Sequence, residues 1–120
     1  MSIEMELYGY LQLNLPQYSV WYGKVDAEDG NKTISMLRLP GTVVLNSPIK
    51  EVNYQISCRA REIDDARTMV DDVVELLRGW YGKLDNTQMR VLSIRDLGDL
   101  YEEDARLVHI PVEVITQIVN

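Results

Sequence analysis

The side chains best suited to acid–base chemistry are the single histidine, His109, and Glu113, which follows it by four residues in the run LVHIPVEV. An imidazole titrates near neutral pH and can move protons. Nucleophilic catalysis also needs an activated nucleophile, but Ser57 and Ser93 lie in strand-like runs without the glycine-flanked turn that exposes a reactive serine. A histidine that alternates with valines is typical of an outward or edge position, and we predict that the protein is not an enzyme.

A group of carboxylates between residues 64 and 75 is the obvious candidate for binding a hard cation, which prefers oxygen ligands. These carboxylates follow a helical pattern, however, and adjacent helical residues point about 100° apart, so they do not share one coordination sphere. We predict no metal site and a solvated helix face formed by Asp64, Asp65, Asp71, Asp72 and Glu75.

The cysteine and glycine patterns give no sign of a cofactor. The single cysteine, Cys58, cannot form an internal disulfide, and the sequence has no CxxC motif or Cys/His cluster that would hold zinc. Because Cys58 occupies an apolar position of a strand pattern, we expect a buried thiol that reacts slowly. No glycine-rich phosphate-binding motif follows a strand-like run, so we predict no bound nucleotide or other cofactor.

The clearest strand in the chain is residues 52–61, VNYQISCRAR, in which apolar and polar side chains alternate without exception. Successive side chains of a strand point to opposite faces of a sheet. One face therefore packs, and it carries Val52, Tyr54, Ile56, Cys58 and Ala60. The other face is polar, and it carries Asn53, Gln55, Ser57, Arg59 and Arg61.

A helix follows this strand, because the period of the apolar residues changes to three and four. Acidic residues near its start suit the helix dipole, and Gly79 or Gly82 can end it. We expect the helix to cover the apolar face of the preceding strand. Its apolar positions are Ala66, Met69, Val70, Val73, Leu76, Leu77 and Trp80.

The first 50 residues predict a second helix and two strands. Ser2 is a candidate N-cap for a helix through about Asn14. Residues 18–25 and 33–39 are strand-like and are expected to form a hairpin around the turn dipeptide Asp29-Gly30. Residues 43–45 are expected to be an exposed apolar loop.

The last 40 residues predict a second hairpin. Residues 89–97 and 107–119 are strand-like, a loop is expected at 83–88, and Pro111 points to a sheet edge or a bulge because it has no amide hydrogen. The predicted order is α-β-β-β-α-β-β. The fold class is α+β, an antiparallel sheet flanked by two helices that lie on one of its faces, in a single domain over residues 1–120.

Composition limits the class of protein. Of the 120 residues, 46% are apolar, which is enough for one packed core. No run of eighteen apolar residues and no basic start is present, so we expect neither a membrane span nor a secretory signal. A net charge of −7 opposes binding to a phosphate backbone. We therefore predict a protein that acts inside a cell or a particle and is not a dedicated nucleic-acid binder.

Segregated charges suggest self-association. Gln55, Arg59 and Arg61 point to one side of their strand, and Arg90 and Arg95 belong to a neighbouring strand. One interpretation is a solvated sheet face. The other is an interface in which this polar face meets the acidic helix face of another copy, carrying Asp71, Asp72 and Glu75, because opposite surfaces favour head-to-tail association that can close into a ring.

The order of these elements resembles the tail terminator and minor capsid proteins of tailed bacteriophages. The likeness runs from about Tyr18 to Ile118 and rests on four stretches, YQISCRAR, EIDDARTMVDDVVELLRGWYG, MRVLSIRDL and EEDARLVHIPVEVIT. It implies an antiparallel sheet flanked by two helices and a ring, commonly a hexamer, that ends growth of the tail tube and joins the tail to the head.

The resemblance also implies partners and places. The partners would be other copies, the tail-tube protein and the head–tail connector, with genomic DNA passing through the channel without specific binding, in the virion and, during assembly, in the host cytoplasm. Gln55, Arg59 and Arg61 match the strand-end positions of the family, and the packing positions of its helix are matched by Ala66, Val73 and Leu77.

Other functions stay open on the sequence alone. A different neck or tail-completion protein would use the same small α+β ring. A monomeric bacterial module would use the sheet to hold a peptide or small ligand. An enzyme would have to use His109 with Glu113, or the pair Asp64 and Asp65.

Overall fold

The computed structural model of the chain describes residues 2–23, 32–41, 43–44, 48–104 and 106–120. The expected Asp29-Gly30 turn and the tip of the apolar loop at Leu45 lie outside these residues, as do the side chains of Val43 and Val44. The described elements are α1 (Ile3–Asn14), β1 (Ser19–Tyr22), β2 (Thr33–Arg38), β3 (Val43–Val44), β4 (Ile49–Ala60), α2 (Ile63–Leu77), β5 (Tyr81–Leu84), β6 (Thr87–Asp96), β7 (Leu100–Glu102) and β8 (Leu107–Val119).

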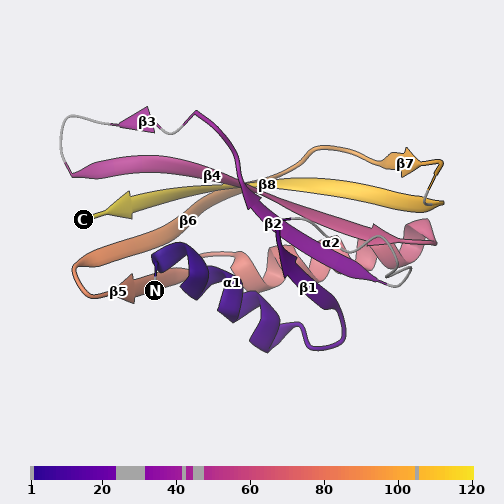
Figure 1. The fold of residues 1–120 in the computed structure, drawn as a ribbon, viewed down its shortest axis with the longest axis horizontal. Helices are drawn as coiled ribbons and strands as arrows, with labels where there is room; N and C mark the ends of the chain where they lie inside the picture. The colour runs from indigo at the N-terminus through magenta and orange to yellow at the C-terminus, as the bar shows by residue number, and fades with distance from the viewer. Residues whose placement is uncertain (1, 24–31, 42, 45–47, 105) are drawn as a thin grey trace.

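Two long strands organise the sheet. β4 and β8 pair antiparallel over almost their whole lengths, from Ile49 opposite Val119 to Ala60 opposite Val108. The main path of the sheet is β1-β2-β4-β8-β6-β5, with β3 beside β4 and β7 beside β8 (Figure 1). β2 and β3 thus follow one side of the central pair, and β6 and β7 follow the other.

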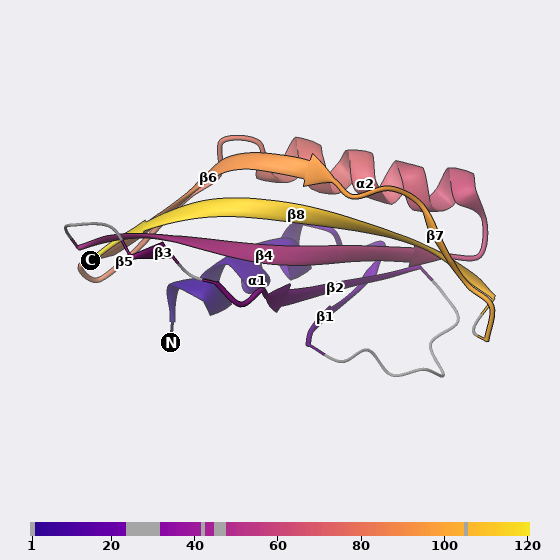
Figure 2. The same ribbon diagram turned by 90° about the horizontal axis from the view of Figure 1, so that it is seen from above.

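Both helices lie on one face of the sheet, below the long strands in Figure 1, and Figure 2 shows that the axis of α2 is roughly aligned with those strands. Their buried residues join the apolar residues of the sheet in one core. Full burial of one large apolar side chain contributes about 1.5–3 kcal/mol to the stability of the folded protein. The core includes Leu7, Leu11, Ile34, Met36, Tyr54, Ile56, Met69, Val73, Leu77, Met89, Ile110 and Val112. The predicted α+β class, with both helices on one face, is confirmed.

The helices begin as the sequence predicts. Ser2 is the N-cap of α1, and its hydroxyl accepts a hydrogen bond from the Met5 amide at 3.2 Å. α2 starts at Ile63 but ends at Leu77, earlier than the apolar pattern indicated, because Gly79 adopts a positive φ of 69° and turns the chain. Trp80 is buried beyond the helix rather than on it.

The first predicted hairpin is wrong. β1 and β2 are neighbours but run parallel, with Ser19 opposite Thr33 and Tyr22 opposite Met36. A tight hairpin turn needs only about two residues, whereas ten residues separate these strands, so their number does not require a hairpin. The sheet is therefore mixed rather than wholly antiparallel.

The predicted order also lacks three short strands, β3, β5 and β7. The loop expected at 83–88 is instead a tight turn, in which Leu84 pairs with Thr87 and Asp85 has a positive φ of 54°. Aspartate and asparagine tolerate this conformation because their short side chains can hydrogen-bond locally. The second predicted hairpin, between β6 and β8, is confirmed.

Pro111 lies on an inner strand in continuous register with β4, whereas a sheet edge or a bulge was predicted for it. The β6 pairing ends at Asp96 opposite Val112, and the β7 pairing begins at Leu100 opposite His109. Pro111 occupies the gap between them, and its carbonyl still accepts a hydrogen bond from the Leu97 amide at 3.0 Å. The missing amide hydrogen therefore falls where this side of β8 changes neighbours.

Candidate functional site: the outer face of the sheet

The face of the sheet opposite the helices carries most of the predicted site residues, and we call it the outer face. No helix covers it within the described part of the chain (Figure 1). The register aligns four strands across it. Its residues are Thr33, Ser35 and Leu37 of β2, Asn53, Gln55, Ser57 and Arg59 of β4, His109, Pro111, Glu113, Ile115 and Gln117 of β8, and Arg90, Ser93 and Arg95 of β6.

A β-bulge places two of the predicted arginines on this face together. Arg90 is opposite Gln117 and Arg95 is opposite Glu113, and both partners belong to the outer face of β8. Residues five apart on a regular strand would point to opposite faces. The register shifts between Val91 and Ser93, so one extra residue restores both arginines to the same side.

Arg59 is the centre of a charged cluster at one end of the outer face. Its Nε donates to Glu102 Oε1 at 2.9 Å, and its Nη1 donates to Ser35 Oγ at 3.0 Å. The Nδ1 atom of His109 lies 3.2 Å from the same carboxylate oxygen. The cluster therefore ties β7, which carries Glu102, to the central strands β4 and β8.

The environment of His109 favours the neutral imidazole. Burial lowers its pKa from the ordinary value of 6.5, the positive charge of Arg59 lowers it further, and only Glu102 acts in the opposite direction. Glu102, not the expected Glu113, is the carboxylate beside His109. The Glu113 carboxylate instead pairs with Arg95, whose Nη2 lies 3.2 Å from its Oε1.

Sequence patterns did not indicate Glu102 or Ser35 as members of the site. Both come from strands that pair with β4 or β8 only in the folded sheet, so no local spacing relates them to Arg59. The one available signal was chemical, because a half-buried arginine needs acceptors and the run YEEDA supplies carboxylates after β6.

Several polar groups of the outer face have unused hydrogen-bonding capacity. Among the described residues, Thr33 Oγ1, Asn53 Oδ1 and His109 Nε2 are buried without a partner. Two longer side chains of this face already make hydrogen bonds, because Gln55 donates to Ser57 and Arg90 donates to Gln117, each at 3.0 Å. Buried polar atoms are normally satisfied, so these three are exceptions on this face.

The predicted acidic surface of α2 divides into two parts. Asp71 and Glu75 are exposed, as expected, and Arg61 is exposed at the end of the polar strand. Asp72, however, is half-buried and accepts a hydrogen bond from the Tyr18 hydroxyl at 2.5 Å. Burial, followed by the bond and negative charge of Asp72, raises the pKa of Tyr18 to about 12. Asp72 therefore connects α2 to the segment before β1, unlike the solvated residue predicted for it.

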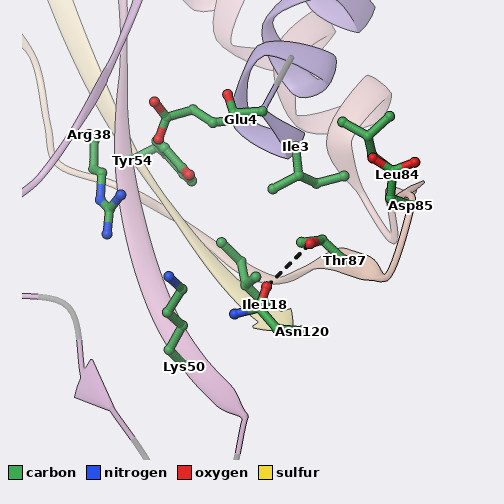
Figure 3. A pocket seen from close by; sticks show the side chains of 11 residues that line it. Ile3, Glu4, Arg38, Lys50, Tyr54, Leu84, Asp85, Thr87, Ile118 and Asn120 are labelled. Carbon is green, nitrogen blue, oxygen red and sulfur yellow. Dashed lines mark hydrogen bonds between the residues drawn. The ribbon is translucent and has the colours of Figure 1, made fainter.

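A separate pocket of about 310 Å³ opens at the opposite end of the molecule from β7, near the start of α1. Figure 3 shows Arg38 and Lys50 on one side, Asp85 on the other, and Ile118 between them. Thr87 Oγ1 donates to Asn120 Oδ1 at 3.2 Å across its rim. Its charges have both signs, so the lining favours neither an anion nor a cation.

Three further features of the described residues bear on metal binding, thiol reactivity and membrane insertion. No group of three His, Cys, Asp or Glu side chains among these residues is arranged to hold a metal ion. Cys58 is buried on the helix-covered face, and burial raises its pKa from 9.0 to about 12. Within the same residues, neither helix has the length and apolar character needed to cross a membrane.

Comparison with solved structures gives a match over nearly the whole chain. A chain from a structure described as the virion of a native gene transfer agent (GTA) particle superposes with a TM-score of 0.66, covering 92% of this chain and 84% of that chain. This chain shares a fold with a virion component. The identity is 13%, which shows likeness of fold alone. No protein-family model and no curated protein matches the sequence. The tail-terminator role stays a prediction.

Proposed function

We propose that the protein is a structural virion component that forms a hexameric ring at the head-proximal end of a phage tail, where it ends growth of the tail tube and joins the tail to the head. The observation that carries this proposal is the shared fold with a chain of a virion over 92% of the sequence. The element order that resembles tail terminators supports the more specific role.

The outer face supports association between copies. It is left uncovered by the two helices, and it carries the exposed arginines Arg90 and Arg95. The acidic residues Asp71 and Glu75 project from the other layer of the protein. Surfaces of unlike charge on opposite layers favour head-to-tail contacts, which close into a ring when the rotation between copies allows it.

In this function the charged cluster is structural rather than catalytic. Arg59 and His109 both engage Glu102 and hold β7 against the sheet. The proposed partners are other copies, the tail-tube protein and the connector, while DNA passes through the ring and is repelled by the net charge of −7. A different neck protein is distinguished by co-purification, because a terminator binds the tail tube and a neck protein binds the connector.

A monomeric ligand-binding module is a second candidate, favoured by the pocket that Arg38, Lys50 and Tyr54 line. Reversing the charge of the outer face separates the two functions. Arg95→Glu should reduce co-sedimentation with assembled tail tubes in the virion function and leave it unchanged in a monomeric module. Leu13→Glu is the matched control, because Leu13 is 80% exposed on α1, away from the outer face.

A further inference from the structure

A short stretch around β7 exposes an unusual amount of apolar surface. Leu97, Leu100 and Tyr101 are 40%, 53% and 61% exposed, respectively, within five residues of chain. Exposed acidic residues, Glu103 and Asp104, follow directly. We call residues 97–104 the β7 segment. Clustered exposed apolar side chains with a polar rim are characteristic of surfaces that bind another protein.

This stretch is held firmly against the rest of the protein. Glu102 accepts from Arg59 on β4, and Arg67 of α2 pairs with both Asp96 and Asp99 at the start of the turn. The Gly98 amide also donates to Asp96 Oδ1 at 2.8 Å. Because the segment is ordered before any partner arrives, little conformational entropy is lost on binding.

A pocket of about 250 Å³ on another part of the surface has the complementary character. It lies between α2 and β6, beside the bulge, and its lining is Val74, Arg78, Gly79, Val91, Leu92, Ser93 and Ile94. We call it the α2–β6 pocket. β5 pairs with β6 only as far as Arg90, and one further hydrogen bond runs from the Val91 amide to the Trp80 carbonyl. The pocket therefore opens beyond the end of β5, where β6 has no paired strand on the side away from β8.

The charges of the two surfaces are also opposite. The one charged residue that lines the α2–β6 pocket is Arg78, whose side chain is 73% exposed. Its Nη1 atom lies 3.9 Å from Oε2 of Glu75, which is not part of the lining. The β7 segment presents Glu103 and Asp104 next to its apolar residues. Apolar contacts surrounded by opposite charges favour one orientation of two partners.

We propose that the β7 segment of one copy inserts Leu100 and Tyr101 into the α2–β6 pocket of a second copy, with Glu103 and Asp104 beside Arg78. This inference rests on the proposed ring and names the contact that would build it. Because the two surfaces are different parts of the same chain, the contact is heterologous and leaves one free segment and one free pocket at the ends of every open assembly.

Two variants test the contact. Tyr101→Glu disrupts the β7 segment and leaves the α2–β6 pocket intact, whereas Leu92→Glu disrupts the pocket and leaves the segment intact. Both side chains are exposed, at 61% and 46%, so both variants should fold. Each variant alone should lose assembly by about tenfold or more, since interface anchors typically contribute more than 1.4 kcal/mol. Mixed together, the two variants should form a 1:1 heterodimer by light scattering, because the intact segment of Leu92→Glu can bind the intact pocket of Tyr101→Glu. Leu13→Glu is the control.

The outcomes separate this inference from the ring itself. Wild-type rings with unchanged yield in Tyr101→Glu and Leu92→Glu would overturn the contact and leave the ring proposal standing. A heterodimer in the mixture, with wild type forming open chains rather than rings, would support the contact and overturn the ring. No association in the mixture at any concentration would overturn the contact. A charge exchange adds a check, because Arg78→Glu should weaken assembly and the addition of Glu103→Arg and Asp104→Arg should restore it.

Discussion

Arg90 and Arg95 lie on the same face of β6, although they are five positions apart and would point to opposite faces of a regular strand. The bulge between Val91 and Ser93 is responsible, because it adds one residue opposite β8 and reverses the alternation. Before the bulge Met89 points to the core, and after it Ile94 does. The same local feature thus keeps the core continuous and gathers the charge of the outer face.

Deleting Leu92 should therefore be tolerated. Val91 is opposite Thr116 and Ser93 is opposite Ile115, so removing the residue between them leaves every other pair in register. We expect a loss of less than about 2 kcal/mol in the free energy of unfolding, measured by urea denaturation. Deleting Ile115 is the matched control and should unfold the protein, because it shifts β8 against both neighbours. Similar losses from the two deletions would show that the register does not control stability.

Val73→Asp should unfold the domain. Val73 is fully buried in the core between α2 and the sheet, and an unpaired carboxylate there costs several kcal/mol. Far-ultraviolet circular dichroism of the purified variant gives the answer directly. Asp71→Val, on the exposed side of the same helix, should remain folded; a folded Val73→Asp protein would mean that the helix packs through another face.

Arg59→Glu should release the β7 segment without unfolding the protein. The substitution removes two hydrogen bonds and places a carboxylate beside Glu102, at a cost of about 1–3 kcal/mol. Amide hydrogen exchange of residues 100–102 should accelerate, and assembly should fall. Arg61→Glu, two residues away and exposed, should leave that exchange unchanged. Unchanged exchange in Arg59→Glu would contradict the anchoring role of the cluster.

Stability should decline at alkaline pH. Burial raises the pKa of Cys58 from 9.0 to about 12, and burial with carboxylate partners raises those of Tyr18 and Tyr22 from 10.0 to about 12. The folded protein holds these protons more tightly than the unfolded chain, so their contribution is complete below about pH 9 and is lost as the pH rises toward 12. Chemical denaturation at pH 8 and pH 11 measures the difference. Equal stability at both would contradict the assigned burial.

The same burial predicts a thiol that resists modification. Reaction requires the thiolate, which is scarce at pH 8 when the pKa is near 12, and Cys58 is also inaccessible. A thiol reagent should label the native protein slowly and the urea-unfolded protein at once. Rapid native labelling would place Cys58 at the surface, on the wrong face of β4.

The elements with strong periodicity were predictable because one physical pattern governs each of them. The alternation in β4 and the helical spacing in α2 both reflect a single apolar face, and that face is buried in the structure. β8 has the predicted bounds for the same reason. Ser2 similarly begins α1, since capping is a local interaction.

Features that depend on partners distant in sequence were not predictable. The parallel pairing of β1 with β2 is set by how the chain returns across the sheet, which residue types alone do not encode. The contact of Tyr18 with Asp72 joins residues 54 positions apart. Glu102 joined the site for a similar reason, because β7 becomes a neighbour of β8 only after the sheet forms.

Closure of several copies of this chain into a ring is the step on which the proposed function depends. The most direct test is light scattering across the size-exclusion peak at several protein concentrations, with negative-stain imaging of the same peak and added tail tubes if the protein is monomeric. We expect a mass near six subunits and closed rings, formed alone or on tube ends. A protein that stays monomeric at every concentration and does not bind the tube would contradict it.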